Sequence, residues 1–314
     1  MKTAIRFSLL IGTVAMRVWP CSASAQIFVA DSSVGRVGEY NESTGATIRD
    51  PVSNPFVNVN GTMTGIACLN GVLYVTDGFD DSIRAFNATT GQPVSGFSLT
   101  GVFSFVIGLT AANNTLYVAN GDAGKVSTYS ATDGHELNDT FVSAGVNGST
   151  DLKVNNGYLY VATPGDTVNR NNGTIGKFDA TTGQVVSTSF ISGLDTPYTL
   201  ALSGNHLFVA SALGDSVAEY DANTGLSINP TLITGLQDPL GMAVDGSHLF
   251  IVNNGTTDPT GFVNEYDLNG NLLIDHFIPT IPDPWGIAIV PEPGSAVLLA
   301  LGIGTLALRR RKAA

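Results

Sequence analysis

Residues 239–253 read PLGMAVDGSHLFIVN: an apolar segment, a polar turn and a second apolar segment. Short apolar segments that contain aromatic and β-branched side chains and are bounded by turn residues indicate buried strands. The aromatic residue of the triplet Leu249-Phe250-Ile251 ends a series that advances in steps of 46, 43, 43, 48 and 42 residues. The chain therefore repeats one unit six times. The other triplets are Ile27-Phe28-Val29, Leu73-Tyr74-Val75, Leu116-Tyr117-Val118, Leu159-Tyr160-Val161 and Leu207-Phe208-Val209.

A second element follows every triplet: Val or Ile, two further residues, and then Tyr or Phe. Residues three apart on a strand point to opposite faces, so this strand carries a large apolar side chain on both faces. Such a strand fits a sheet packed between two neighbouring sheets and not a sheet with one wet face. The pairs are Val37/Tyr40, Ile83/Phe86, Val126/Tyr129, Ile175/Phe178, Val217/Tyr220 and Val263/Tyr266.

A third apolar element precedes each triplet except the first, and tight Asn-Gly turns such as residues 70–71 and 156–157 favour hairpins between the two. One further copy, residues 286–289, has no triplet after it. The last strand is therefore expected to complete the first unit and close a ring, which protects sheet edges. The copies that precede a triplet are residues 64–67, 107–110, 151–154, 199–202 and 241–244.

A repeat of this length with several strands in each unit is typical of β-propeller blades. The sequence predicts an all-β protein: a six-bladed β-propeller of four-stranded blades over residues 26–290, closed by the C-terminal strand joining the N-terminal blade. Turns at residues 87–91, 179–183 and 221–225 begin with Asn or Asp and end with Gly. These residue types supply turn hydrogen bonds and positive φ, which favours a structural role.

The arrangement is similar to NHL-type and related six-bladed propellers. The residues that carry the resemblance are 239–245, 249–251 and 266–267 of one blade, and residues 283–288 repeat its start. The resemblance implies the fold of the body and leaves its function open, because such propellers host many functions.

The N-terminal segment has the three parts of a secretory signal peptide. Lys2 and Arg6 precede an apolar centre, and Ala23-Ser24-Ala25 provides small residues for cleavage before Gln26. Residues 1–25 are therefore expected to lie outside the propeller and to direct export.

The C-terminal segment, residues 291–314, also has the features of a targeting signal. Pro291, Glu292 and Pro293 precede a stretch without charge at residues 295–308, and Arg309, Arg310, Arg311 and Lys312 follow. Fourteen residues make a helix of about 21 Å, short for a bilayer core of about 30 Å, and flanking residues extend it to a plausible short span. The basic cluster would stay cytoplasmic, and one interpretation is a simple membrane anchor.

The order of these three parts closely resembles the PEP-CTERM sorting signal of Gram-negative bacteria. The resemblance implies recognition by a membrane exosortase, processing near Glu292, and transient residence of the C-terminal helix in the inner membrane. It also implies release or attachment at the cell surface or in the extracellular matrix, together with exopolysaccharide.

The charge of the body excludes some partners. The two ends hold seven of the 14 basic and one of the 26 acidic residues, so the body keeps seven basic and 25 acidic residues, a net charge of −18. So acidic a surface repels nucleic acid and an anionic membrane face. Cys68 is the one cysteine of the body, so the body has no intrachain disulfide, and we expect an inert thiol.

Polar residues directly follow the triplets, at one mouth of the expected ring. Asp31, Asp77, Asn120 and Asn253 occupy matching positions there. Carboxylate and amide oxygens are the ligands that calcium prefers, so one hypothesis is a calcium site at the central channel. The alternative is that Asp and Asn start turns at these positions, and no other cofactor is expected. Thr163 and Ser211 fill the two remaining positions.

The longer loops at this mouth are the expected place for binding, because functional residues favour loops on a rigid scaffold. The hypothesised ligand-binding residues are Asp80, Asp81, Asp122 and Trp285, where Trp285 would stack on a sugar or pack into the core. No nucleophile elbow, zinc-protease or phosphate-loop motif occurs. No catalytic residue can therefore be named.

The expected function is binding or scaffolding of extracellular polysaccharide or another surface protein. Some related six-bladed propellers are lactonases or lyases with a channel metal, so the alternative is a calcium-dependent hydrolase or lyase. A third possibility is a passive spacer in the matrix. His206 and His248 lie at the opposite mouth and are expected to be surface turn residues.

Overall fold

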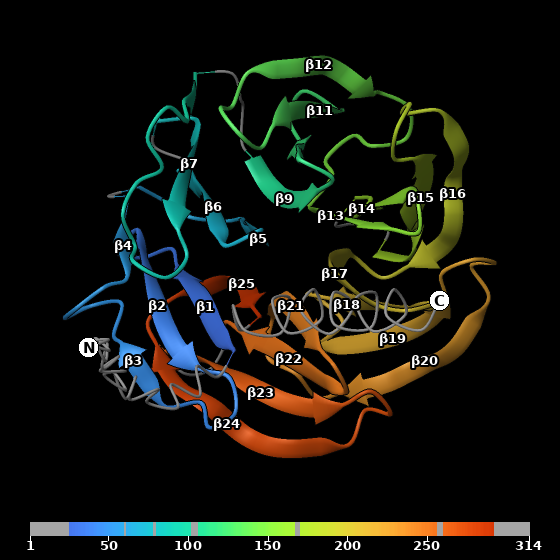
Figure 1. Ribbon diagram of the computed structural model, residues 1–314. Helices are drawn as coiled ribbons and strands as arrows, with labels where there is room; N and C mark the ends of the chain where they lie inside the picture. Colours follow the sequence, from blue (N-terminus) through green and yellow to red (C-terminus); the bar gives the residue numbers. More distant parts are fainter. Residues whose placement is uncertain are drawn as a thin grey trace, which may run out of the picture.

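The computed structural model describes residues 25–59, 61–77, 80–101, 106–166, 170–255 and 260–291. Six antiparallel sheets are arranged around a central channel (Figure 1). Blade 1 consists of β25 (Pro284–Val290), β1 (Gln26–Asp31), β2 (Arg36–Asn41) and β3 (Thr47–Arg49), with β4 (Val57–Asn58) also paired to β2. The predicted all-β, six-bladed propeller is confirmed.

Each of the other blades is built from four consecutive strands, and one 3-10 helix, η1 (Arg170–Asn172), precedes β15. Blade 2 has β5 (Ile66–Leu69), β6 (Val72–Asp77), β7 (Ser82–Asn87) and β8 (Leu99–Thr100); blade 3 has β9 (Val106–Ala112), β10 (Thr115–Asn120), β11 (Lys125–Ser130) and β12 (Glu136–Val142). Blade 4 has β13 (Asp151–Asn155), β14 (Tyr158–Thr163), β15 (Gly173–Asp179) and β16 (Val185–Leu194). Blade 5 has β17 (Pro197–Ser203), β18 (His206–Ser211), β19 (Ser216–Asp221) and β20 (Ser227–Thr234), and blade 6 has β21 (Pro239–Asp245), β22 (His248–Asn253), β23 (Gly261–Asp267) and β24 (Leu272–Ile281).

The ring closes as predicted, through the first and last strands of the propeller. β25 pairs antiparallel with β1, so that Gln26 lies opposite Val290 and Phe28 opposite Ala288. The strands β25, β5, β9, β13, β17 and β21 are the innermost of their blades (Figure 1).

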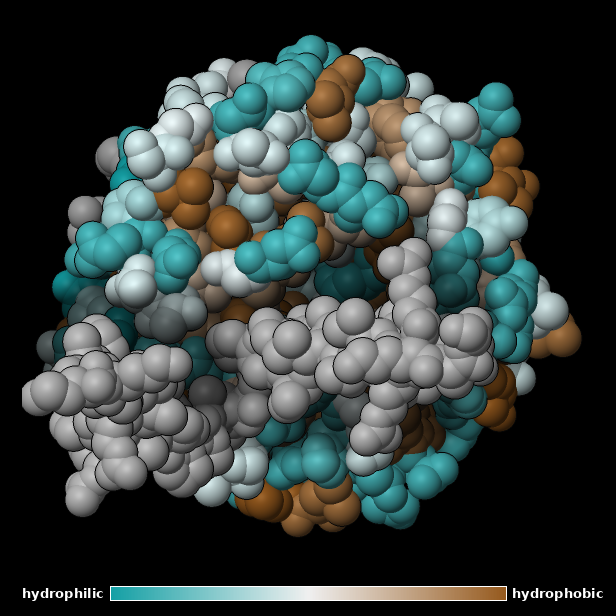
Figure 2. Space-filling model, in the orientation of Figure 1, coloured by the Kyte–Doolittle hydropathy of each residue, from teal (hydrophilic) through white to brown (hydrophobic). Residues whose placement is uncertain are grey.

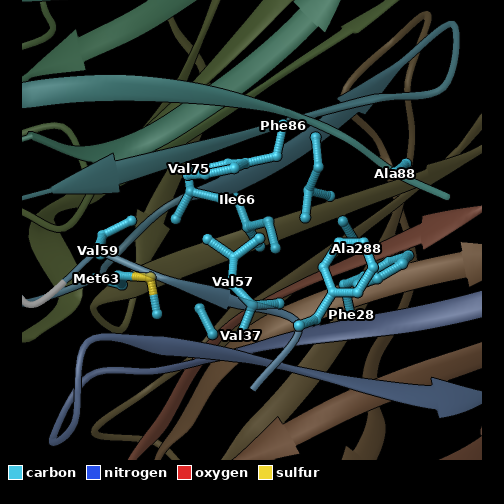
Figure 3. Close-up of a cluster of buried hydrophobic side chains, with 13 residues drawn as sticks. Phe28, Val37, Val57, Val59, Met63, Ile66, Val75, Phe86, Ala88 and Ala288 are labelled. Atoms are coloured by element: carbon cyan, nitrogen blue, oxygen red, sulfur yellow. The ribbon is translucent and has the colours of Figure 1, made fainter. Parts of the chain in front are cut away.

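The core lies between the blades rather than on one face of each sheet. Val37 belongs to a buried cluster shared with blade 2, whereas Tyr40, three residues later, packs against blade 6. Figure 3 shows the first of these clusters, in which Phe28 and Val37 of blade 1 gather with Val75 and Phe86 of blade 2. The prediction that these strands are apolar on both faces is therefore confirmed.

Turns lock each blade to the preceding one. The Asp221 carboxylate accepts hydrogen bonds from the backbone N–H groups of Asn223 and Thr224, at 3.0 and 2.8 Å. Gly225 ends the turn with φ of 74°, and a Cβ there would lie 2.6 Å from the carbonyl oxygen of Phe190 in blade 4. Glycine is needed here both for the positive φ and for this close approach.

The ring has two faces, which differ in their loops. The strands β1, β6, β10, β14, β18 and β22 end at one of them, which we call the mouth face. The same strands begin at the opposite face, which we call the turn face. The turns of residues 87–91, 179–183 and 221–225 lie on the turn face, because β7, β15 and β19 run toward it.

Candidate functional site

The central channel narrows at the mouth face and widens toward the turn face. A small cavity of about 30 Å³ lies where the innermost strands begin, and its lining includes Thr64, Thr150 and Tyr198. A wider cavity of about 250 Å³ follows, lined largely by aliphatic side chains and by Cys68. Burial raises the pKa of the Cys68 thiol to about 11, which keeps it protonated and unreactive at neutral pH.

Glycines allow the innermost strands to approach one another at the narrow end. A Cβ on Gly108 would lie 2.7 Å from the Cα atom of Asp151 in the next blade, and one on Gly241 would lie 2.5 Å from the carbonyl oxygen of Trp285. Blade 4 has Asp151 at the matching position. Its carboxylate accepts hydrogen bonds from the Leu200 N–H at 2.8 Å and the Thr199 hydroxyl at 3.1 Å in blade 5. Between blades 4 and 5, hydrogen bonds from a carboxylate therefore take the place of the close backbone approach that glycine allows between other blades.

Lys153 neutralises this bridge from within the channel. Its Nζ lies 2.8 Å from both carboxylate oxygens of Asp151. Among the residues that line the two cavities, these two are the charged ones. The two charges therefore satisfy each other at the wall of the channel.

Two aromatic rings meet at the mouth face. Tyr198 and Trp285 follow Pro197 and Pro284 at the start of β17 and β25, and their ring centroids lie 6.4 Å apart in an edge-to-face arrangement. Both side chains are half-buried. Blade 6 lies between their two blades and contributes Leu240 at the matching position.

Polar groups hold the Trp285 ring in place. Its Nε1–H donates to Oδ1 of Asp283 at 3.1 Å, and the same oxygen accepts from Nδ2 of Asn254 at 2.8 Å. The Asn254 N–H donates to the carbonyl oxygen of Asp238 at 3.1 Å. These bonds connect the loops of blades 1, 5 and 6 around the aromatic pair.

The acids beside the pair are crowded. Burial raises the pKa of Asp238, and the negative charges of Asp215 and Asp283 raise it further. Burial also raises the pKa of the Tyr198 hydroxyl, and the charges of Asp238 and Asp151 add to this effect. The mouth face therefore combines two aromatic rings with several carboxyl groups that lie close to one another.

Asp31, the first hypothesised calcium ligand, is fully buried at the end of β1. Its Oδ1 accepts from the N–H and hydroxyl of Ser33, at 3.1 and 2.7 Å. Its Oδ2 is buried and receives no hydrogen bond from the described residues. Burial raises the pKa of Asp31, and the nearby charge of Asp283 raises it further.

The other three hypothesised ligands are buried at the same position of their blades and have local partners. An Asp77 carboxylate oxygen lies 2.9 Å from a guanidinium nitrogen of Arg84. Oδ1 of Asn253 accepts from the Gln237 N–H at 2.9 Å. Asn120 is the last residue of β10 and is also buried. Within the described residues, no group of three His, Cys, Asp or Glu side chains is placed to hold a metal ion. The calcium hypothesis, which includes amide ligands, stays a prediction.

The remaining hypothesised binding residues do not join the aromatic pair. Asp80 is exposed and forms an ion pair of 2.7 Å with Arg84. Asp81 has a positive φ of 47° in the β6–β7 turn, and Asp122 is exposed in the β10–β11 turn. Trp285 is therefore the one residue of this set that the structure places within a constellation.

The predicted targeting segments lie largely outside the described residues. Pro291 is described and exposed, whereas Glu292, Pro293, Arg309, Arg310 and Arg311 fall outside, as do residues 1–24 and the predicted C-terminal helix. Within the described ranges, no helix has the length and apolar character needed to cross a bilayer.

Two family models match parts of the sequence. Residues 290–312 match the PEP-CTERM protein-sorting motif, which confirms that resemblance and implies exosortase-dependent export to the surface of a Gram-negative bacterium. Residues 79–172 match a family described as outer membrane protein assembly factor BamB. No curated protein matches the chain.

One of two similar solved structures supports a shared fold. The chain is similar to a protein in the crystal structure of a nidogen/laminin complex, with a TM-score of 0.68, 15% identity, and coverage of 85% of this chain and 98% of that one. The designed protein Ika8 gives a TM-score of 0.47 and 18% identity, covering 83% of this chain and 74% of that one. At this identity the first likeness concerns the fold alone.

Sequence reasoning missed Tyr198 and Asp151. The signal for Tyr198 was the repeated Pro-aromatic start of Pro197-Tyr198 and Pro284-Trp285. The signal for Asp151 was an acid at a position where four other innermost strands have glycine: Gly65, Gly108, Gly241 and Gly286.

Proposed function

We propose that this protein is an exported surface propeller that binds exopolysaccharide at its mouth face, through Trp285 and Tyr198. The observation that carries the proposal is the half-buried aromatic pair, 6.4 Å between centroids, framed by Asp283, Asn254 and Asp238. The PEP-CTERM motif supports a place at the cell surface, where such polymers occur.

The chemistry of this mouth suits a neutral sugar. Aromatic side chains present an apolar face with little conformational entropy to lose, which suits the C–H face of a pyranose ring. Carboxylate oxygens accept hydrogen bonds from sugar hydroxyls, and amide groups donate and accept. The acids at the mouth repel anionic polymers, so the preferred ligand is an uncharged polysaccharide.

The channel favours binding over catalysis. Its one ion pair, Asp151 with Lys153, has both partners at hydrogen-bond distance and bridges two blades. A general acid or base needs a free position beside the reacting atom. The rigid ring therefore acts as a platform for the loops at its mouth.

The test is binding of purified protein to the exopolysaccharide of its host, followed by affinity electrophoresis and by Trp285 fluorescence in a Trp19→Phe background. Dextran serves as a neutral probe and alginate as an anionic one. We expect Trp285→Ala and Tyr198→Ala each to weaken binding about fivefold or more, because stacking of a nucleobase on an aromatic side chain, a comparable contact, contributes roughly 1–3 kcal/mol per ring. Trp285→Phe should retain much of the affinity.

The control is Ser143→Ala, which changes an exposed residue just after β12 at the mouth face, outside the hypothesised binding residues. Undiminished binding by folded Trp285→Ala protein would contradict the proposal, as would a preference for alginate over neutral polymers.

A second candidate function is calcium binding at the mouth face, favoured by the buried, unpartnered Oδ2 of Asp31. Calcium takes six to eight oxygens, of which one side chain supplies at most two. A melting-temperature rise in millimolar calcium relative to EDTA, lost in Asp31→Asn, is the expected result if this site operates. An unchanged melting temperature would contradict it.

A further inference from the structure

Both ends of the propeller leave the same face. β1 begins at Gln26 and β25 ends at Val290, and these two residues lie opposite each other in an antiparallel pair. Both therefore lie at the turn face. The segments that carry the export and sorting signals consequently extend from adjacent points of that face, beside the channel.

The connection to the C-terminal apolar stretch is short. Four residues, 291–294, separate Val290 from the uncharged stretch 295–308. An extended chain of four residues spans at most about 14 Å. With the apolar stretch in a bilayer, the turn face lies close to the membrane. The mouth face lies about 20 Å farther away, since the strands between the faces are six residues long.

The turn face has an apolar rim. Nine of the eleven large hydrophobic residues that are exposed in the described part of the chain lie near the start of an outermost strand, close to this face. Leu226 and Ile228, for example, flank Ser227, which pairs with Tyr220 at the turn-face end of β19. Val52 and Leu213 are the two that lie elsewhere. The apolar rim consists of Ile48, Leu137, Val185, Val186, Leu226, Ile228, Leu272, Leu273 and Ile274.

The rim follows the ring of blades, with a gap at blade 2. Its members come from matching positions in blades 1, 3, 4, 5 and 6, so they lie at a similar height around the propeller. Hydrophobic residues appear as separate patches along the periphery of the molecule in Figure 2. A flat surface touches all such patches at once, whereas a compact protein partner touches one or two blades.

The charge of the turn face selects the type of lipid. Asp179 and Asp221 begin two of its turns, and hydrogen bonds from the turn residues lower the pKa of both carboxyls. These acids are therefore ionised at neutral pH and repel anionic headgroups. The apolar rim consequently fits a zwitterionic or uncharged lipid surface.

We propose that, before processing, the propeller rests on the bilayer through its apolar rim and holds its mouth face away from the membrane. The inference requires the sorting segment, residues 290–312, to be in the membrane, and it does not depend on polysaccharide binding at the mouth face. A short tether gives an effective concentration in the millimolar range, so a weak contact is sufficient. The orientation presents Trp285 and Tyr198 to polymer outside the membrane.

The test uses the full chain with Cys21→Ser and Cys68→Ala in phosphatidylcholine vesicles, some of whose headgroups carry a nitroxide quencher. One cysteine is introduced for a fluorescent label, at Thr181 on the turn face or at Ala123 on the mouth face, both of them exposed. We expect a several-fold loss of emission from the label at Thr181→Cys and little change from the label at Ala123→Cys.

A rim variant, Leu226→Ser with Leu272→Ser and Leu273→Ser, should lose most of the quenching at Thr181→Cys. The matched control is Val52→Ser with Leu213→Ser, which changes the two exposed apolar residues outside the rim and should leave the quenching unchanged. Replacing part of the lipid with phosphatidylglycerol should weaken the quenching.

Three results would overturn the inference: equal quenching of the two labels, quenching that survives in the rim variant, and quenching that depends on the density of protein in the vesicle, which would indicate a second copy. Failure of the chain to float with the vesicles would also overturn the inference, because it would contradict membrane residence of the sorting segment. It would leave the proposed polysaccharide binding at the mouth face untouched.

Discussion

Tyrosine hydroxyl groups connect neighbouring blades, and their removal should have unequal costs. Tyr117 donates to the carbonyl oxygen of Ala180 at 2.7 Å, and Tyr160 donates to that of Ala222 at 2.7 Å. Both are the aromatic residues of their triplets, and both are buried. The Ala222 oxygen has a second donor, because Nζ of Lys177 lies 2.9 Å from it.

Tyr117→Phe leaves a buried carbonyl without this donor, which costs about 1–3 kcal/mol. Tyr160→Phe leaves the Ala222 oxygen bonded to Lys177, so the loss is that of one ordinary hydrogen bond, about 0.5–1.5 kcal/mol. In a domain of this size each kcal/mol lowers the melting temperature by roughly 2–4 °C. We expect the larger decrease for Tyr117→Phe.

The assay is guanidinium unfolding followed by circular dichroism, with thermal unfolding as a second measurement. The double variant Tyr160→Phe with Lys177→Met should lose more stability than the two single variants together, because only the pair of changes removes both donors. Equal losses for Tyr117→Phe and Tyr160→Phe, or strict additivity in the double variant, would refute the reasoning.

Three further predictions concern closure, pH and export. Ile287→Ala in the closing strand β25 should cost about 2–5 kcal/mol in denaturant unfolding, because Ile287 is buried, whereas exposed Ile274→Ala should change stability by less than about 0.5 kcal/mol. Because the pKa of Asp31 is raised in the folded protein, its contribution is most favourable below its ordinary pKa and is lost as pH rises through the raised value. In EDTA, Asp31→Asn should therefore gain stability relative to the parent protein between pH 4 and pH 7, and melting curves at both pH values check this. Replacing Glu292 and its two prolines should block C-terminal processing in the native host. If the mass of the variant, measured by mass spectrometry, still decreases as that of the parent protein does on processing, exosortase dependence is contradicted.

Much of the fold was predictable because local chemistry repeats. Six aromatic triplets and six Val/Ile-x-x-Tyr/Phe pairs predicted strands buried on both faces, and the clusters around Val37 and Tyr40 confirm this. The missing partner strand at each end predicted that β25 would pair with β1. Turn residues such as Asp221 and Gly225 act over a few positions, so their role was visible without tertiary information.

The candidate site was less predictable. Matching positions after the triplets suggested four equivalent ligands, yet their surroundings differ. Asp77 has Arg84 beside it, whereas Oδ2 of Asp31 has no donor among the described residues. Equivalent positions in a repeat share backbone geometry, but the partners come from loops that do not repeat.

By itself, the sequence determined the blade repeat, the closure of the ring, the acidic surface and the sorting address, because each depends on patterns that are local or periodic. Only the tertiary structure brought Tyr198 of blade 5 to Trp285 of blade 1, replaced glycine contact by the Asp151 carboxylate at one seam, and gathered exposed apolar residues into a rim at the face from which both ends leave. The physical reason is that these contacts join different blades. Their geometry depends on how each strand is placed around the channel, which no short segment encodes.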